Sequence, residues 1–236
     1  MQINKYKKLP LGNRDFSGVN MMAGYWSEAI HAAAFQVLYD AYPPPAKVLD
    51  VGAGQGAFSK RLAEAGYDVV AIEKFAEFKV PSVECWRINL NEEWPQNIGE
   101  PFDVVVGIEI IEYVENPFHF IRQARAKLKA NGIGKMIVTS PNPLNTLERL
   151  QFLLQGKINI LDHEDHRTPI FPQSMHKLCN ECGFRIIKHT FDIDPLSVHS
   201  SLKGYIGKKI LWLSSVFMRN REYLKGVSNV WLLKTE

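Results

Sequence analysis

Two rhythms of hydrophobic and polar positions alternate along the chain. Between stretches with helical spacing, such as Phe58, Leu62 and Ala65, lie short apolar runs that are typical of strands. These runs cover 46–54, 68–73, 83–89, 102–110, 134–142, 184–191 and 227–235. Strands that alternate with helices, joined by right-handed crossovers, predict an α/β fold with a doubly wound, mostly parallel sheet and helices on both faces.

Three consecutive prolines at 43–45 mark the sharpest boundary, because proline cannot continue a helix. The length suits one α/β domain covering 1–236. Within it, we expect an N-terminal helical cap at 1–42. The rhythm loosens after the fifth and the sixth strands, so the segments 145–172 and 195–226 are expected to be insertions that cover the site as lids.

Composition and charge narrow the class of protein. With 46% hydrophobic and 22% charged residues, the chain has the make-up of a water-soluble globular protein. Lys and Arg total 28 against 25 Asp and Glu, and a net charge of +3 is too small to make nucleic acid an expected partner. The odd count of three cysteines suits a reducing compartment. Because the sequence shows neither a secretory signal nor an apolar run of about 20 residues, we expect a cytoplasmic protein.

A glycine-rich loop follows the first predicted strand, where 50–56 is D-V-G-A-G-Q-G. Glycines there let a ligand approach the backbone while the next helix presents its N-terminus. The pattern alone also fits a dinucleotide site or a turn without a ligand. Asp50 favours a cationic ligand with an ammonium or sulfonium group, because a carboxylate would repel a pyrophosphate. Glu73, at the end of the second strand, can accept hydrogen bonds from both ribose hydroxyls of an adenosine.

Four segments in order, VLDVGAGQG, VVAIE, INL and FDVVVGIEIIEYVENP, resemble a class I S-adenosylmethionine-dependent methyltransferase of the small-molecule branch. The resemblance implies a Rossmann-like fold, S-adenosylmethionine as cofactor and S-adenosylhomocysteine as product. Asn89 stands where this family usually has Asp, and its carbonyl oxygen still permits a hydrogen bond to the adenine amino group. The expected cofactor residues are Asp50, Gly52, Ala53, Gly54, Glu73, Lys74, Asn89, Leu90 and Ile108.

Resemblance to ubiquinone-type and glycan-type O-methyltransferases implies O-methylation of a small hydroxylated metabolite, a quinol precursor or a sugar. In those enzymes a His commonly precedes an aromatic-Pro segment, as His166 precedes 171–172 here. A hydroxyl acceptor benefits from a base, and His is the usual one at neutral pH, so His166 is the leading candidate. Glu109 is expected beside the methionine part of the cofactor. Tyr113 lines the acceptor pocket or packs in the core.

Other interpretations of these histidines remain open. His163 and His166 can also belong to an exposed charged turn in which both side chains are solvated. His31 and His189 lie in predicted regular elements away from the strand ends, and we interpret them as structural or solvated. A metal has to be considered because Glu109 and Glu112 are paired, but Tyr113 replaces the His that follows Glu-x-x-Glu in metal-using relatives, so we expect none.

Two rival functions share the cofactor loop. One is a nucleic-acid or protein methyltransferase, and the other is a scaffold that binds adenosylmethionine without catalysis. A basic, apolar helical stripe at 202–219 can make weak contact with an anionic membrane surface, or it can pack on the sheet. A small-molecule acceptor is expected, whereas its identity and the oligomeric state do not follow from any sequence pattern.

Overall fold

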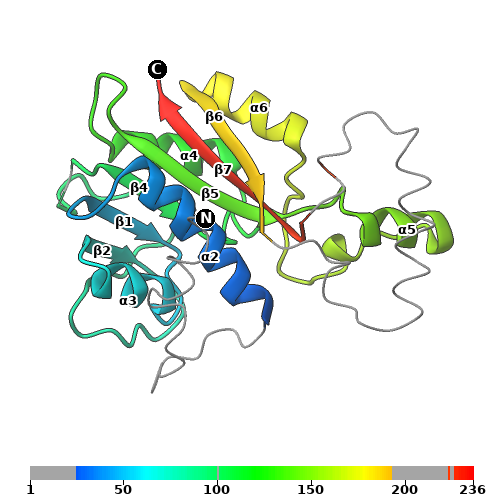
Figure 1. The fold of residues 1–236 in the computed structure, drawn as a ribbon, viewed down its shortest axis with the longest axis horizontal. Coiled ribbons are helices and arrows are strands. Elements are labelled where there is room, and N and C mark those ends of the chain that lie inside the picture. The colour runs from blue at the N-terminus through cyan, green and yellow to red at the C-terminus, as the bar shows by residue number, and fades with distance from the viewer. Residues whose placement is uncertain (1–24, 100, 193–222, 224–225) are drawn as a thin grey trace, which may run out of the picture.

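The computed structural model describes residues 25–99, 101–192, 223 and 226–236 (Figure 1). Its centre is a seven-stranded sheet in the order β3-β2-β1-β4-β5-β7-β6. The strands are β1 (Lys47–Val51), β2 (Asp68–Ile72), β3 (Glu84–Trp86), β4 (Val104–Gly107), β5 (Lys135–Pro141), β6 (Phe184–Phe191) and β7 (Ser228–Thr235). Strands β1 to β5 are parallel, whereas β7 is antiparallel to both β5 and β6. The predicted mostly parallel sheet is confirmed.

Helices cover both faces of this sheet. They are α2 (Tyr25–Ala41), α3 (Ala57–Glu64), α4 (Pro117–Ala126) and α6 (Pro172–Glu181). Residues of α2 and α3 share one apolar cluster with Val48 and Val104, and residues of α4 and α6 share a second cluster with Leu49 and Val105. Neighbouring residues of one strand thus enter opposite cores, because successive side chains alternate between the faces. Burial on both faces explains why these strands are continuous apolar runs in the sequence.

The order of the strands reverses at β1, which positions the site. β1 pairs with β2 on one side and with β4 on the other, both in parallel register. The backbone N–H groups of Gly52 and Ala53 donate to the carbonyl of Ile72 over 2.9 and 3.1 Å, which attaches the loop after β1 to the end of β2. Open α/β sheets bind ligands at such a switch point, outside the carboxyl ends of the strands.

The segment 145–172 contains a helix that was not predicted from the sequence. α5 (Thr146–Gln155) begins where the side chain of Asn145 accepts two backbone N–H groups of the first turn, at 2.9 and 3.0 Å. It ends at Gly156, which has a left-handed φ of 69°. A short 3₁₀ helix, η2 (Asn159–Leu161), follows it.

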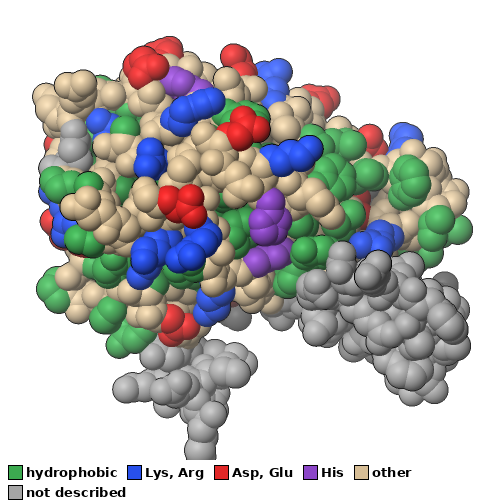
Figure 2. All heavy atoms as spheres, turned by 90° about the horizontal axis from the view of Figure 1, so that it is seen from above, with side chains coloured by type: hydrophobic (Ala, Val, Ile, Leu, Met, Phe, Trp, Pro, Cys, Tyr) green, Lys and Arg blue, Asp and Glu red, His purple; other side chains and the backbone are tan. Residues whose placement is uncertain are grey.

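Three successive apolar residues on α5, Phe152, Leu153 and Leu154, are exposed. Figure 2 shows hydrophobic side chains gathered on the surface over this end of the molecule. Leu147, Leu150 and Leu154 recur at helical spacing, so the pattern was present in this segment although no helix was predicted from it. Whether the segment closes over the site as a lid stays a prediction.

Some expectations fall outside the described residues. These are the part of the N-terminal cap at 1–24, the stripe at 202–219, and the second insertion at 195–226 apart from Tyr223 and Gly226. Within the described part of the chain, no helix is long and apolar enough to cross a membrane.

Candidate cofactor and acceptor site

Two adjoining cavities lie at the carboxyl ends of the parallel strands. The larger has a volume of about 580 Å³ and the smaller about 340 Å³, and Gly52 and Tyr113 line both. Of the other residues expected from the sequence, the larger cavity is lined by Glu73, Lys74, Asn89 and Leu90, and the smaller by Asp50, Ala53, Gly54, Ile108, Glu109 and His166. The fold therefore brings every predicted site residue into one region.

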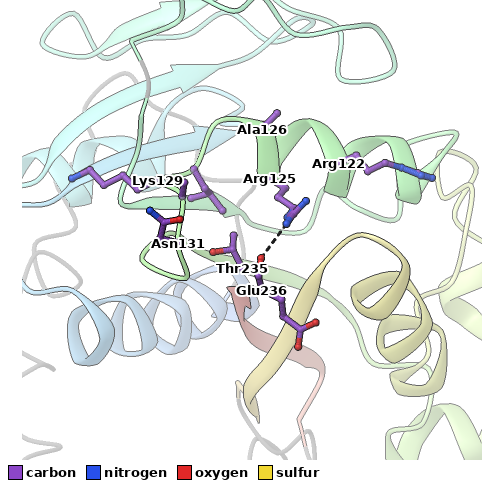
Figure 3. Close-up of a pocket in the computed structure, with 9 residues that line it drawn as sticks. Arg122, Arg125, Ala126, Lys129, Asn131, Thr235 and Glu236 are labelled. Atoms are coloured by element: carbon purple, nitrogen blue, oxygen red, sulfur yellow. Dashed lines mark hydrogen bonds between the residues drawn. The ribbon is translucent and has the colours of Figure 1, made fainter.

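A third hollow, of about 540 Å³, lies beside the end of α4 and the end of β7 (Figure 3). Arg125 Nη2 donates there to the backbone oxygen of Glu236 over 3.1 Å. The side chains of Arg122 and Lys129 also line the hollow, and in Figure 3 they point away from one another. Basic groups that diverge do not form a binding site, so the two adjoining cavities remain the candidate site.

The glycine loop owes its shape to backbone conformations that favour glycine. Gly52 and Gly54 have φ values of 72° and 58°. A Cβ atom on Gly52 would overlap the side chain of Ile110, whereas one on Gly54 would meet no atom within 4 Å. Gly52 is therefore required by the packing of the protein itself. Gly54 instead leaves open space above the backbone, as the close approach of a ligand requires.

Two buried carboxyl groups flank this loop. Asp50 accepts a hydrogen bond from the Ser59 hydroxyl at 2.6 Å, and burial raises the pKa of Asp50 to about 7 even though that hydrogen bond lowers it. Glu73 accepts three backbone N–H groups, from Gly54 to Oε2 and from the two residues 75–76 to Oε1, at 2.7 to 2.9 Å. Each carboxylate oxygen has two lone pairs, so Oε1 is fully used and Oε2 keeps capacity for one ribose hydroxyl.

Asn89 already uses both ends of its amide. Its Nδ2 donates to Glu92 Oε1 at 3.0 Å, and its Oδ1 accepts the backbone N–H of Asn91 at 3.2 Å. An adenine amino group would have to share that oxygen through its second lone pair. Buried Ile88 and Leu90 provide the apolar lining of the same cavity.

Glu109 lies in the turn directly after β4, with an unusual left-handed φ of 49°. Its Oε1 accepts from the Thr139 hydroxyl at 2.7 Å and its Oε2 from the Ser228 hydroxyl at 3.2 Å. Burial, together with the negative charge of Asp192, raises the pKa of Glu109 to about 7, although both hydroxyls lower it. Two strands, β5 and β7, thus hold this carboxyl group at the cavity wall.

Glu112 follows one turn later and is the most unusual group of the site. Its side chain is 1% exposed and lines the smaller cavity, yet neither carboxyl oxygen has a hydrogen-bond partner among the described residues. Burial and the neighbouring Glu109 raise the pKa of Glu112 well above its usual range. The sequence analysis considered Glu112 only as a metal ligand. No three described His, Cys, Asp or Glu side chains cluster as a metal site would require.

His166 lies where the two cavities meet. Its ring is half-buried and stands edge-on to the ring of Tyr113, with centroids 4.9 Å apart. His166 Nδ1 lies 2.8 Å from the carbonyl oxygen of Ile160, which can only accept, so Nδ1 carries the proton. The neutral ring therefore keeps a lone pair on Nε2. Burial lowers the pKa of His166, which favours this neutral form.

The backbone of the histidine segment is fixed to the turn after β4. The N–H groups of Arg167 and Thr168 donate to the carbonyl of Glu112 over 2.7 and 3.2 Å. His163 stacks on His166, with centroids 4.4 Å apart, but it is exposed and lines neither cavity. His166 is thus half-buried at the smaller cavity whereas His163 is exposed, and the role of His166 stays a prediction.

His31, for which the sequence favours a structural or solvated role, does make structural contacts, and it also lies at the cavity. It lines the smaller cavity with its neighbour Ile30, and its Nδ1 contacts Nη1 of Arg61. Helical spacing identifies the buried face of α2, but it cannot show which part of that face passes beside the glycine loop. This position follows only from the packing of α2 against the sheet.

Comparisons with known proteins agree with this geometry. The sequence profile described as a methyltransferase domain matches residues 22–189, and the chain belongs to this family. It is therefore an S-adenosylmethionine-dependent methyltransferase, as the resemblance implied. Two similar curated proteins are ubiquinone biosynthesis O-methyltransferases. The enzyme of Roseobacter denitrificans is 30% identical, over 70% of this chain and 71% of its own length. The enzyme of Ruegeria sp. is 24% identical, over 74% of this chain and 69% of its own length.

Solved structures confirm the Rossmann-like fold. A SAM-dependent methyltransferase from Archaeoglobus fulgidus superposes with a TM-score of 0.60 at 16% identity, over 88% of this chain and 94% of that one. A second similar structure is the 1,6-didemethyltoxoflavin-N1-methyltransferase of Burkholderia thailandensis, solved with 1,6-didemethyltoxoflavin and S-adenosylhomocysteine. It superposes with a TM-score of 0.57 at 13% identity, over 88% of this chain and 78% of that one. At such identities the likeness shows the fold alone.

Proposed function

We propose that this methyltransferase methylates a hydroxyl group of a small acceptor, with His166 as the general base. The position of the His166 ring carries the proposal. The ring lines the smaller cavity beside Tyr113, which borders both cavities. With Nδ1 committed to the carbonyl of Ile160, the free lone pair on Nε2 is available for the proton of an acceptor.

The lining residues fit adenosylmethionine. We assign the ribose to Glu73 and the adenine to the wall at 88–90 in the larger cavity, and the amino-acid part to Asp50 and the open space over Gly54 in the smaller one. Three backbone N–H groups fix the Glu73 carboxylate, so it is oriented before a ligand arrives. Adenosylmethionine bound there supplies a methyl group on a sulfonium, whose C–S electron pair leaves with the sulfur.

The chain's own residues then have two tasks, positioning and proton removal. His166 Nε2 takes the hydroxyl proton as the acceptor oxygen forms its new bond to the methyl carbon. The half-buried ring can later release that proton to solvent. Tyr113 forms the wall against which the acceptor packs, and Glu109 lies across the same cavity. Alignment of the reacting atoms supplies much of the rate in such displacements.

A small acceptor is supported by the size of the site. A cavity of about 340 Å³ has the size of a small-molecule site. The names of the ubiquinone biosynthesis relatives support an oxygen acceptor. We also propose a cytoplasmic location, since none of the three cysteines forms a disulfide. Membrane contact through 202–219 stays a prediction.

A screen of acceptors tests the proposal. The full chain is incubated with adenosylmethionine and separate panels of phenols, quinol precursors, sugars and amines, and mass spectrometry detects the gain of one methylene unit. We expect products from a hydroxylated panel. Methylation of amines alone would contradict the proposal. Binding of S-adenosylhomocysteine without turnover on any panel, or on nucleic acid and protein, would favour the scaffold.

A further inference from the structure

A half-buried histidine and a buried arginine from two different helices form a pair beside the smaller cavity. His31 belongs to α2 and Arg61 to α3, and Arg61 Nη1 is within hydrogen-bond reach of His31 Nδ1. Arg61 is 0% exposed, which is rare for an arginine. The His31 ring also packs against Phe58, with centroids 4.9 Å apart. Both groups are therefore held by packing as well as by their mutual contact.

The pair fixes the protonation state of His31. A guanidinium group has donors and no acceptor, so His31 Nδ1 must accept, and the proton of the neutral ring resides on Nε2. Burial and the positive charge of Arg61 lower the pKa of His31 to about 3, so the ring is neutral throughout the physiological range. No acceptor among the described residues takes the Nε2 proton. His31 lines the cavity, and Nε2–H is the hydrogen-bond donor that its neutral ring can offer to a ligand there.

The rest of this cavity is acidic. Asp50, Glu109 and Glu112 line it, and all three are carboxyl groups in buried surroundings. The raised pKa values leave these groups partly protonated near neutral pH, and a cationic group would favour their ionised form and be attracted by it. At the wall formed by His31 the preference is reversed, because the buried guanidinium of Arg61 lies behind it.

We propose that His31 binds the carboxylate of the amino-acid part of the cofactor through its Nε2–H, and that Arg61 is the positioning residue that fixes this tautomer. The proposal rests on the assignment of the amino-acid part to the smaller cavity. Its ammonium and carboxylate groups need opposite environments, and the cavity offers both: carboxyl groups on one wall and the His31–Arg61 pair on the other. In the described part of the cavity lining, His31 is the side chain backed by a buried cation.

Two ligands that differ by the carboxylate test this assignment. S-adenosylhomocysteine carries the group, and decarboxylated S-adenosylhomocysteine lacks it while keeping the adenosine and the amine. Calorimetric titration of both measures Kd for the full chain and for His31→Phe. We expect the substitution to weaken S-adenosylhomocysteine about 10- to 100-fold, the factor typical of a hydrogen bond to a charged group, and to leave the decarboxylated ligand unchanged.

Matched variants separate this role from a structural one. His31→Gln can accept from Arg61 through Oε1 and donate from Nε2, so it should restore most of the affinity for S-adenosylhomocysteine. Arg61→Gln should selectively weaken the same ligand, because a neutral amide no longer fixes the tautomer. His176→Phe, on the exposed face of α6, is the control and should change neither Kd. Thermal denaturation identifies any variant that does not fold. If His31→Phe does not fold, the affinity of His31→Gln for S-adenosylhomocysteine decides whether the donor assignment holds.

The outcomes are distinguishable. Equal weakening of both ligands by His31→Phe, or no weakening of either, would overturn the role of His31. Failure of His31→Gln to recover affinity would overturn the donor assignment. If the unmodified chain binds neither ligand, the proposed function fails instead, and with it the basis of this assignment.

Discussion

The Oε2 atom of Glu73 accepts the backbone N–H of Gly54 over 2.8 Å. This bond joins the loop after β1 to the end of β2, and Oε1 of the same carboxylate accepts two further N–H groups from 75–76. One side chain therefore shapes the glycine loop and faces the larger cavity. Because backbone hydrogen bonds fix this carboxylate, it is oriented before a ligand binds.

Replacing this carboxylate should weaken cofactor binding. Glu73→Ala removes the acceptor for a ribose hydroxyl as well as the three hydrogen bonds that orient the loop. We expect S-adenosylhomocysteine to bind about 1.5 to 3 kcal/mol more weakly, the range for hydrogen bonds to charged groups. Calorimetric titration measures the change, and Glu77→Ala, at an exposed position nearby, is the control. Equal affinities of the two variants would contradict the role of Glu73.

The two loop glycines should respond differently to a methyl group. Gly52→Ala forces a Cβ atom into Ile110 at a left-handed φ and should lower the free energy of unfolding by more than about 2 kcal/mol. Gly54→Ala meets no protein atom, so only the backbone strain of about 1 kcal/mol remains. Its main effect should be weaker binding of S-adenosylhomocysteine. Denaturant unfolding and titration separate the effects, and normal affinity of a folded Gly54→Ala would show that no ligand approaches there.

Sequence patterns located the parts of the site that depend on local structure. Asp50 lies near the end of β1 and Glu73 directly after β2, and the carboxyl ends of parallel strands meet at one edge of the sheet. The positions of His31 and Glu112 at the cavity were missed for a different reason. Each lies in an ordinary local context, and its role follows from which element packs against it. A side chain such as Arg61, buried behind His31, leaves no trace in hydrophobic periodicity because arginine is usually exposed.

Stability should fall as pH rises because of the paired carboxyl groups. The folded-state pKa values of Glu109 and Glu112 are raised above the ordinary value of 4.5, to about 7 for Glu109. Above pH 4.5 the unfolded chain has lost these protons while the folded chain still holds them, so stability declines from there through the folded-state pKa. Each group can contribute a slope of up to about 1.4 kcal/mol per pH unit within its window.

Glu112→Gln should flatten this decline, because an amide does not ionise. We expect its melting temperature to exceed that of the unmodified chain at pH 7.5 and the two to converge toward pH 5, as thermal denaturation over that range would show. Glu115→Gln, at an exposed position of the same turn, is the control and should follow the unmodified chain. A pH profile of Glu112→Gln identical to that of the unmodified chain would mean that Glu112 is not a buried acid.

Removing the proposed base should reduce turnover far more than cofactor affinity. His166→Ala should lower kcat by 10² to 10⁴, roughly 3 to 5 kcal/mol of barrier, with little change in the Kd of S-adenosylhomocysteine. Because burial lowers the pKa of His166, the acid limb of the rate profile should lie below the ordinary value of 6.5 and disappear in the variant. His163→Ala, which removes an exposed ring outside both cavities, should be milder. A larger loss in His163→Ala would assign the base to that histidine, and full activity of both would leave catalysis to positioning alone.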